Sequence, residues 1–420
     1  MSLISSYESA LKFLFNIKGE KNELSNMRVL SRFFDYPEKK YKIVHVTGTN
    51  GKGTTSTYLA KILEHAGYRV GLFNSPHVDR FSERIRVSSE EIKESFVVGF
   101  IDQIKACIKK EGIKPTFFEI NTIMALKYFE ESKVDIAVVE VGVGGRRDAT
   151  NIIDPELSII TSISLDHELY LGSDLKSIAF EKGGIIKENR PVIIGKIEGD
   201  ALYTLITIAD KKSAPSFIYG RDFSIEIKKD YSFVFKAGKR VYKDLLPTIA
   251  GDHVRYNIAL SILASTFFDK VKDEHIYKAV AKKNNILPAR SELIEYKGKS
   301  ILFDVCHNPD GARVFCETLK KYFNSYNRIF ILAAMLRNKA YNEMIDEFVK
   351  VSFCCTLTTF NYERSFDPNC IAESLKSKIV IIKDPQQALA SNLKDMGERD
   401  ILCVVGSFYF LNVIRKIVTC

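Results

Sequence analysis

The sequence predicts an α/β protein with two domains: a first domain built on a mostly parallel sheet, and a smaller Rossmann-like α/β domain after it. Short apolar runs alternate with amphipathic helical stretches between residues 43 and 405, as in βαβ units. With 420 residues, 46% of them hydrophobic, the chain can bury two cores. Residues 216–250 instead alternate with a period of two around turn signals, which predicts a small antiparallel β insert in the first domain.

We place the domain boundary after residue 288, because the polar stretch 282–298 contains Pro288 and separates two series of strand-like runs. The first domain, residues 1–288, is expected to begin with an amphipathic helix near residues 7–15 and to contain strands at 43–46, 71–73, 135–140, 157–163 and 191–195. The second domain, residues 289–420, is expected to contain strands at 301–304, 329–332, 353–357, 379–382 and 401–405.

The hydrophobic pattern indicates a soluble protein. The longest apolar runs, such as residues 329–336, are too short to span a bilayer. Residues 1–8 lack the charged-then-apolar order of a secretion signal. We therefore expect a cytoplasmic protein with no membrane partner.

The cysteines and the charges exclude two further classes of protein. The eight cysteines include no Cys-x-x-Cys pair, which argues against a zinc ribbon or a redox motif, and the adjacent Cys354 and Cys355 fit a reduced, half-buried strand. The net charge of +9 is dispersed, without a basic tail or an aromatic-spaced basic stripe. We expect no nucleic-acid partner, since anionic small substrates explain the excess of Lys and Arg equally well.

The glycine-rich turn at residues 48–54 has the features of a phosphate-binding loop. It lies between the apolar run 43–46 and a helical pattern over 56–67. Its glycines let the backbone approach an oxyanion, its N–H groups and the helix N-terminus supply positive potential, and Lys52 adds a full charge. The turn therefore suits a nucleotide triphosphate.

The sequence of this turn departs from the usual P-loop motif, which has a glycine five positions before the Gly-Lys pair and a hydroxyl residue directly after it. Val46 and Gly53 stand at those two positions, so the loop is shorter and its hydroxyl, Thr54, comes one residue later. A glycine-rich hairpin is the alternative interpretation. A random turn, however, rarely combines strand, lysine, threonine pair and amphipathic helix in this order.

Two later strands end in polar side chains that could serve the same site. Glu140 ends one apolar run and precedes a glycine-rich segment, where Mg²⁺ would bridge its carboxylate to phosphates. A carboxylate in a salt bridge is the alternative. Asp166 and His167 end the next strand. Because histidine is an unusual Mg²⁺ ligand, an ordinary loop histidine stays open at this point.

A series of short motifs runs through the chain in a specific order, at residues 48–54, 75–77, 117–119, 140–151, 165–167, 181–187, 251–257, 288–290 and 304–309. In this order they resemble the bacterial dihydrofolate synthase/folylpolyglutamate synthase branch of the Mur ligase superfamily. The resemblance covers nearly the whole chain. It implies a Mur-ligase-type ATP-binding domain over residues 1–288 and a glutamate-ligase domain over residues 289–420.

The resemblance also implies the contacts of ATP and of two Mg²⁺ ions. ATP would bind to Thr49, Asn50, Gly51, Lys52, Gly53, Thr54, Asn257, Arg290 and Asp304, the last two from the far side of an interdomain cleft. Magnesium would bind to Thr54, Ser75, Glu140 and His167. The implied catalytic residues are Lys52, His167 and Lys182, of which Lys182 is carbamylated in the family. That reaction needs a neutral amine, so burial or a cationic neighbour must depress the pKa of this lysine; a solvated helix lysine is the alternative.

The implied acceptor-binding residues are Phe117, Phe118, Glu119, Arg147, Asp148, Ala149 and His307. The chain departs from the family pattern at several positions. Arg147 stands for Leu, Val305-Cys306 for Gly-Ala, Val254 for Gln, Ala289 for Gly and Ser291 for Phe. Arg147 adjoins the segment that would meet the pterin, so this departure bears on the choice of substrate.

The implied activity is ATP-dependent amide formation in folate biosynthesis. ATP converts a carboxylate to an acyl phosphate, which the α-amino group of L-glutamate attacks; catalysis is then mainly placement and electrostatics. The carboxylate belongs to dihydropteroate or to the glutamate tail of a folate. We expect a monomer that acts on these small molecules.

Three other functions stay open as alternatives. A peptidoglycan Mur ligase performs the same chemistry, but carries a UDP-binding domain before the loop, and only 47 residues precede Gly48 here. A P-loop switch or nucleic-acid motor is disfavoured by the spelling of the loop and by the lack of an Asn-Lys-x-Asp motif. A scaffold with an inactive site is disfavoured because Lys52, Glu140, His167 and Lys182 are all present.

Overall fold

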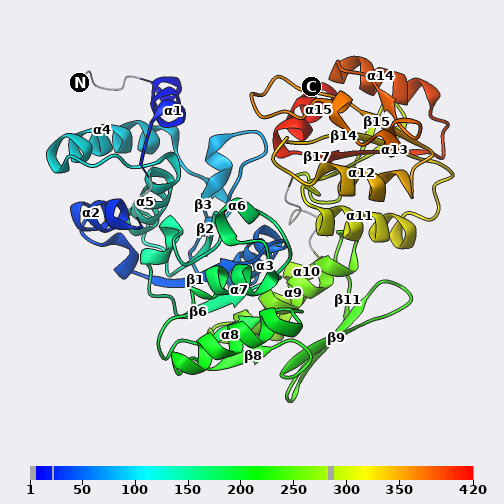
Figure 1. Ribbon diagram of the computed structural model, residues 1–420. Coiled ribbons are helices and arrows are strands. Elements are labelled where there is room, and N and C mark those ends of the chain that lie inside the picture. Colours follow the sequence, from blue (N-terminus) through cyan, green and yellow to red (C-terminus); the bar gives the residue numbers. More distant parts are fainter. Residues whose placement is uncertain (1–5, 21–22, 282–287, 420) are drawn as a thin grey trace. The chain divides into compact units, whose positions relative to one another are not determined.

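The computed structural model describes residues 6–20, 23–281 and 288–419 (Figure 1). The chain forms two compact units, the first comprising Met1–Leu246 and Tyr256–Asn285, the second Pro247–Arg255 and Ile286–Cys420. The boundary expected after residue 288 stays a prediction, since residues 282–287 of the expected linker lie outside the described residues. Among the described helices, none combines the length and the apolarity needed to cross a lipid bilayer.

The first unit is built on an eight-stranded sheet with the strand order β4-β3-β2-β5-β1-β6-β7-β8 (Figure 1). Neighbours from β2 to β8 run parallel, and only the β2-β3 and β3-β4 pairs are antiparallel. The strands are β1 (Lys42–Thr47), β2 (Val70–Phe73), β3 (Ile85–Val87), β4 (Glu90–Glu91), β5 (Ile136–Glu140), β6 (Leu157–Ile160), β7 (Val192–Ile194) and β8 (Ser216–Ile218).

The helices of this unit follow the strands as the periodicity predicts. They are α1 (Tyr7–Asn16), α2 (Ser25–Phe33), α3 (Lys52–His65), α4 (Glu94–Glu111), α5 (Phe117–Glu131), α6 (Glu168–Leu171), α7 (Leu175–Gly183), α8 (Gly199–Lys211), α9 (Asp252–Ser265) and α10 (Asp273–Ala281). Short 3-10 helices lie at η1 (Pro37–Lys39), η2 (Phe81–Arg84) and η3 (Ala149–Ile152). Residues 252–255 of α9 belong to the second unit.

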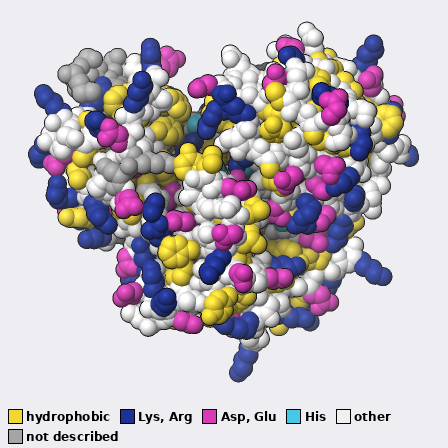
Figure 2. Space-filling view, in the orientation of Figure 1, with side chains coloured by type: hydrophobic (Ala, Val, Ile, Leu, Met, Phe, Trp, Pro, Cys, Tyr) yellow, Lys and Arg dark blue, Asp and Glu magenta, His cyan; other side chains and the backbone are white. Residues whose placement is uncertain are grey.

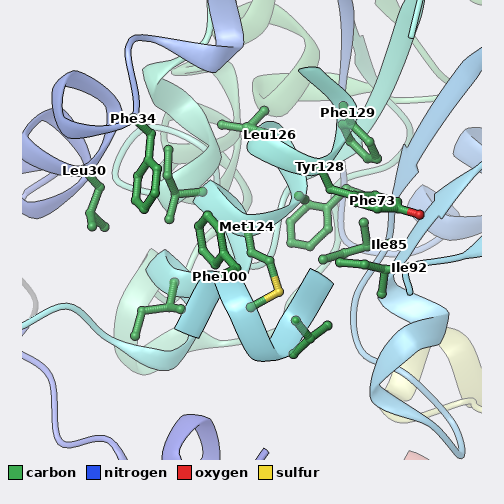
Figure 3. Packing of buried hydrophobic residues seen from close by; sticks show 14 of the residues in the cluster. Leu30, Phe34, Phe73, Ile85, Ile92, Phe100, Met124, Leu126, Tyr128 and Phe129 are labelled. Atoms are coloured by element: carbon green, nitrogen blue, oxygen red, sulfur yellow. The ribbon is translucent and has the colours of Figure 1, made fainter. Parts of the chain in front are cut away.

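Two cores cover the sheet of the first unit. The larger one joins α1, α2, α4 and α5 to side chains of β1, β2 and β5; Figure 3 shows Phe34, Phe100 and Met124 among its members. Phe100 is 1% exposed and stacks on Phe34 and Phe96, at ring-centroid distances of 4.8 and 5.7 Å. The other core packs α7 and α8 against β6 and β7.

Both cores lie on the same face of the sheet, because Ile43 pairs with Ala137 and Thr47, on the same face of β1, pairs with Ile160. Helix α3 also packs against β1, β2 and β5. A parallel sheet covered by helices needs apolar strands, which is why its central strands read as continuous apolar runs.

The β insert is shorter than the predicted residues 216–250. Its three strands are β9 (Phe223–Ile227), β10 (Phe233–Ala237) and β11 (Arg240–Leu245), all antiparallel. Residues 216–218 form β8 instead, which pairs in parallel with β7 at the edge of the main sheet. The period-two pattern therefore identified the hairpins correctly, but could not show that residues 216–218, at the start of the expected insert, form a strand that pairs with the main sheet.

The second unit has a six-stranded sheet in the order β12-β13-β17-β14-β15-β16, parallel except for the β12-β13 pair. The strands are β12 (Glu292–Tyr296), β13 (Lys299–Asp304), β14 (Ile329–Ala334), β15 (Cys354–Leu357), β16 (Val380–Ile381) and β17 (Ile401–Gly406). The helices are α11 (Pro309–Tyr322), α12 (Tyr341–Val349), α13 (Glu373–Lys376), α14 (Pro385–Asp395), α15 (Phe408–Thr419) and the 3-10 helix η5 (Pro368–Cys370).

Lys and Arg side chains are interspersed with Asp and Glu on the face of the molecule that Figure 2 shows. The described cysteines are all free, with Cys354 half-buried and Cys355 buried on β15. Both observations agree with the expectation of dispersed charge and reduced thiols.

Phe100→Ala is expected to lower the free energy of unfolding of the first unit by about 3–5 kcal/mol, because it leaves a cavity between stacked rings. Urea titration followed by circular dichroism measures this change. Tyr203→Ala on α8, where the tyrosine is 72% exposed, serves as the control and should change it by less than about 0.5 kcal/mol. A Phe100→Ala effect as small as the control's would show that the ring stack does not support this core.

Candidate active site

Four adjacent strands of the first unit end at the same edge of the sheet, in the order β2-β5-β1-β6. Ser75 follows β2, Glu140 ends β5, the glycine-rich turn follows β1, and His167 follows β6. The strands are parallel and in register, with Val46 of β1 beside Glu140 of β5. The carboxyl ends of parallel strands are where α/β sheets bind ligands, so this edge is the candidate site.

The turn needs glycines at residues 48 and 51, because other segments of the chain leave no room for a Cβ there. A Cβ at Gly48 would lie 1.8 Å from Thr161 Oγ1, closer than any real contact. Gly51 has a left-handed φ of +86° and precedes α3, and a Cβ there would lie 2.3 Å from Asn257 Oδ1. Asn257, on α9, is thereby placed against the turn, as the resemblance implied.

Hydrogen bonds attach the turn to the segment after β6. The amide of Thr49 donates to the carbonyl of Ser162 at 2.9 Å, and the amide of Ser164 donates to Thr49 Oγ1 at 3.0 Å. The hydroxyls of Thr161 and Ser162 both donate to the carbonyl of Asn50, at 2.6 and 3.0 Å. These bonds fix the path of the turn, so that its backbone N–H groups keep one orientation toward a ligand.

Lys52 and Lys182 converge on one backbone oxygen. Lys52 Nζ donates to the carbonyl of Gly48 at 3.0 Å, and Lys182 Nζ donates to the same oxygen at 2.8 Å. Lys182 is buried on α7, and its burial, followed by the positive charge of Lys52, holds its pKa well below the ordinary 10.5. The lowered pKa favours the expected neutral amine, and the burial of Lys182 shows that the alternative of a solvated helix lysine is wrong.

Glu140 is a buried carboxylate at the centre of the strand ends. Its Oε2 accepts from Asn74 Nδ2 at 2.8 Å and from the amide of Ser75 at 3.2 Å, and the residue is 3% exposed. Two neutral donors therefore orient one oxygen of this buried carboxylate, and a carboxylate is a group to which Mg²⁺ binds.

Thr54, Ser75 and Glu140 would offer oxygen ligands to Mg²⁺, and His167 would offer a ring nitrogen. Thr54 lies half-buried in the first turn of α3. No group of three or more His, Cys, Asp or Glu side chains that could hold a metal occurs within the described ranges. Mg²⁺ commonly combines one or two carboxylates with water and substrate phosphates.

His167 has a left-handed backbone with φ 54° and begins α6. Its amide donates to Asp166 Oδ1 at 2.8 Å, and its Nε2 lies 3.9 Å from Asp166 Oδ2. Asp166 is 8% exposed. The imidazole therefore lies beside a buried carboxylate, which can orient the ring.

The aromatic pair at the start of α5 lies near the ends of β2 and β5. The Phe117 ring stacks on Phe15 of α1 with centroids 5.3 Å apart. The Phe118 ring lies 5.9 Å from that of Phe73 and would meet a Cβ at Gly142 at 2.6 Å.

Glu119 caps α5. Its Oε2 accepts from the amide of Thr116 at 2.6 Å and from Asn26 Nδ2 at 3.3 Å, while Thr116 Oγ1 accepts from the amide of Glu119 at 3.3 Å. This reciprocal capping box accounts for the buried carboxylate. A role for Glu119 in binding a substrate stays a prediction.

Arg147, Asp148 and Ala149 lie in the segment between β5 and β6 and differ in exposure. Arg147 is half exposed and lies 3.5 Å from Glu23. Asp148 is buried, accepts from the amide of Val143 at 3.0 Å and begins η3; Ala149 is 7% exposed. Arg147 can therefore contact a ligand directly, whereas Asp148 holds the backbone around it.

The second unit gathers its predicted residues at the end of β13. Asp304 Oδ2 accepts from the amide and the hydroxyl of Ser291 at 2.8 and 3.0 Å. Burial raises the pKa of Asp304, and Arg290 opposes this shift. The Arg290 guanidinium and the His307 ring both face Phe408, with 5.2 Å and 6.1 Å to its ring centroid. Arg290, Asp304 and His307 thus form one cluster.

The departures from the family pattern have a structural account in this cluster. Ala289 stands at φ +60°, a left-handed conformation that a glycine adopts at less cost. Its amide donates to Glu292 Oε2 at 2.8 Å, and Arg415 holds that carboxylate with two bonds. Ser291 supplies the hydroxyl bond to Asp304 that a Phe could not make. Hydrogen bonds therefore hold this turn in the left-handed conformation that a glycine would adopt at less cost.

Two residues of the first unit hold predicted site residues: the sequence did not single out Asn74, and it placed Asp166 at a strand end without assigning it a role. Asn74 orients Glu140, and Asp166 lies beside His167. Each of them immediately precedes a predicted site residue at the end of a strand, and this position indicates that it could contribute to the site. The contact of Asn74 with Glu140, however, joins residues far apart in the sequence, and the contact of Asp166 with His167 depends on the local turn.

Two protein-family descriptions match the chain. "Mur ligase middle domain" matches residues 46–265, and "Mur ligase, glutamate ligase domain" matches residues 289–408. A dihydrofolate synthase/folylpolyglutamate synthase of Bacillus subtilis is 33% identical over 417 residues, covering 95% of each chain. A folylpolyglutamate synthase of Lacticaseibacillus casei is 31% identical and covers 90% of each chain.

Solved structures show the same fold over the whole chain. Escherichia coli FolC in complex with DHPP and ADP has a TM-score of 0.89 at 28% identity, covering 100% of this chain and 99% of that one. The bifunctional folylpolyglutamate synthase/dihydrofolate synthase of Yersinia pestis, complexed with AMPPNP and Mn ion, has a TM-score of 0.90 at 26% identity, with full coverage of both chains.

The depressed pKa of Lys182 predicts a pH-dependent stability. Between the folded-state pKa and the ordinary 10.5, the unfolded chain binds more protons, so the free energy of unfolding should rise with pH, by at most about 1.4 kcal/mol per pH unit. Lys182→Met should lack this rise. Urea unfolding in CO₂-free buffer from about pH 7 to about pH 10 measures it.

Lys176→Met is the matched control, since Lys176 is exposed on the same helix. This variant should keep the slope of the parent protein. Equal slopes for the parent and Lys182→Met would contradict the buried neutral amine.

Proposed function

Because the chain belongs to the dihydrofolate synthase/folylpolyglutamate synthase branch of the Mur ligase family, we propose that it joins L-glutamate to dihydropteroate, to the γ-carboxyl of a folate, or to both, with ATP as the energy source. The observation that supports this most directly is the glycine-rich turn at the strand ends, where Lys52 and Lys182 both donate to the carbonyl of Gly48. Such a turn binds phosphates, and the acyl-phosphate route requires a triphosphate beside a carboxylate.

In this proposal ATP binds to the turn formed by Thr49, Asn50, Gly51, Lys52, Gly53 and Thr54. Lys52 already lies over the turn, bonded to the carbonyls of Gly48 and Thr49. On binding, its ammonium exchanges these carbonyls for phosphate oxygens and offsets the negative charge that develops during transfer. Asn257 contacts the nucleotide from α9, where it lies against Gly51.

Thr54, Ser75, Glu140 and His167 would hold two Mg²⁺ ions. When bound, the ions neutralise phosphate charge and align the transferring group with the acceptor carboxylate. Asn74 and the Ser75 amide fix one oxygen of Glu140, so the carboxylate has one orientation before any cation arrives. Asp166 would do the same for His167.

Lys182 would act as a carbamate. Its neutral amine attacks CO₂, forming an N–C bond, and loses a proton to give an anionic carbamate close to the second metal site. The burial of Lys182 and the charge of Lys52, which depress its pKa, supply the amine that this step needs. The reaction converts a residue that is a poor metal neighbour into an oxygen ligand.

The remaining predicted residues would bind the other substrates. Phe117, Phe118, Glu119, Arg147, Asp148 and Ala149 would surround the acceptor in the first unit. Arg290 and Asp304 would contact ATP from the second unit, where His307 would contact a substrate. We further propose that the protein acts in the cytoplasm, as a monomer, without nucleic-acid or membrane partners. A peptidoglycan-type acceptor is not favoured, because the named relatives match nearly the whole chain as folate ligases.

Glutamate-dependent release of ADP tests the proposal, with dihydropteroate and tetrahydrofolate offered in parallel. We expect release with at least one acceptor, and a loss of at least about 100-fold in Lys52→Ala, which lacks the charge on the transferring phosphoryl group. Lys61→Ala on the same helix is the control, since Lys61 pairs with Glu64 away from the turn. No release with either acceptor, from folded and metal-loaded protein, would remove the proposed function.

Glu140→Gln is expected to raise the Mg²⁺ concentration for half-maximal rate by about 10-fold or more, because an amide is a weaker ligand than a carboxylate. A Mg²⁺ titration of ADP release measures the change. Glu156→Gln, a part-exposed partner of Arg190 before β6, should leave it unchanged. A Glu140→Gln protein with lower turnover but the same Mg²⁺ requirement would contradict the metal role.

A further inference from the structure

The strand that leads into the phosphate-binding turn also holds the segment that follows Glu140. His45 and Thr47 are alternate residues of β1, so their side chains point to the same face of the sheet. Thr47 Oγ1 donates to the carbonyl of Gly144 at 2.6 Å, and His45 Nε2 lies 2.8 Å from Thr150 Oγ1. Strand β1 therefore contacts residues 142–150 at two points directly before Gly48.

The contact through His45 continues to Asp148. Thr150 Oγ1 donates to Asp148 Oδ1 at 2.6 Å, and the amide of Thr150 donates to the same oxygen at 3.0 Å. Asp148 Oδ2 accepts from the amide of Val143 at 3.0 Å. One buried carboxylate thus joins both ends of the segment 143–150, and a histidine of β1 reaches it through a hydroxyl.

These contacts determine the tautomer of His45. Because the single hydroxyl proton of Thr150 is donated to Asp148, its oxygen can only accept from the imidazole. His45 must therefore carry hydrogen on Nε2. Its Nδ1 has no hydrogen-bond partner among the residues that the structure describes, and the ring is 0% exposed. Burial and the charge of Lys187 lower the pKa of His45 to about 3, so the ring stays neutral at working pH.

A buried ring nitrogen without a partner is costly, and an apolar side chain at position 45 would avoid that cost. Ile43, two residues earlier on the same face of β1, fills its place in the core without any polar atom. Packing alone therefore does not explain a histidine at this position. The Nε2–H donor to Thr150 is what the histidine adds.

We propose that His45 is a positioning residue: through Thr150 it fixes Asp148, and thereby sets the backbone of residues 142–150 relative to the phosphate-binding turn. This inference rests on the proposed function, in which Arg147 and Ala149 of this segment contact the acceptor. Amide formation requires the acceptor carboxylate to lie in line with the terminal phosphate. His45 and Thr47 link the structures that place these two groups.

The proposal predicts a selective kinetic effect. His45→Leu removes the donor and should raise KM for the acceptor about 10-fold, while KM for ATP stays within about 2-fold, because the turn keeps its own bonds to residues 161–164. In His45→Gln the amide nitrogen can replace Nε2–H, which should restore KM for the acceptor to within about 3-fold. Steady-state ADP release with each substrate varied in turn measures both constants.

Thr150 gives an independent pair of variants. Thr150→Val should reproduce the effect of His45→Leu, whereas Thr150→Ser should not, because it keeps the hydroxyl. Ser158→Ala is the control for a lost buried hydrogen bond: Ser158 lies beside His45 on β6, is 1% exposed and donates to the carbonyl of Ile185. We expect normal KM values for both substrates in this variant.

The tautomer provides a readout that does not depend on turnover. Long-range ¹H–¹⁵N spectra of protein labelled at its histidines should show one neutral ring protonated on Nε2 that is lost in His45→Gln. An Nδ1–H ring at this position would overturn the proposal. So would His45→Leu protein with an unchanged acceptor KM, or with both KM values changed equally. Absence of glutamate-dependent turnover in the parent protein would instead overturn the proposed function.

Discussion

Two lysine amines share the carbonyl oxygen of Gly48, and the chemistry of the site depends on this arrangement. The two groups are kept close by different elements, the start of α3 and the last turn of α7. Because one amine is buried, the pair is most stable with a single positive charge. The half-buried Lys52 has a positive charge that suits phosphate, and the lowered pKa of Lys182 favours the neutral amine that the proposed carbamate formation requires.

The parallel sheet places the other groups around this pair. Strands β2, β5, β1 and β6 are neighbours, so side chains that follow them are brought to one edge although they lie up to 113 residues apart in the sequence, from Thr54 to His167. Each is held by a nearby polar group, such as Asn74 at Glu140 and Asp166 at His167. The site is therefore oriented before substrates bind, which is how most of the catalytic effect arises in phosphoryl transfer.

Hydrogen bonds replace conformational freedom where the chain departs from the family pattern. Ala289 occupies a left-handed conformation at a cost of about 1–2 kcal/mol. The bonds that the Ala289 amide donates to Glu292 and the Ser291 hydroxyl donates to Asp304 offset this strain. The same principle applies in the first unit, where Asp148 and Thr150 hold the segment after Glu140. In both places, a buried carboxylate organises the backbone near the predicted substrates.

The sequence by itself determined the elements and the local motif. The parallel strands other than β8, and the phosphate-binding turn, were predictable, because periodicity and glycine spacing depend on residues within one or two turns of each other. The short antiparallel strands β3, β4 and β12 were not expected. The family resemblance pointed to Lys52, Glu140, His167 and Lys182 in advance. Only the tertiary structure decided that residues 216–218 join the main sheet and that Glu119 caps its own helix.

Tertiary structure also decided the electrostatics of the site. The lowered pKa of Lys182 and the link from His45 to Asp148 depend on burial and on partners more than 100 residues away. Local sequence patterns carry no information about such distances. They report which side chains are available, whereas the packing of the sheet decides which of them lose contact with water and which charges they meet.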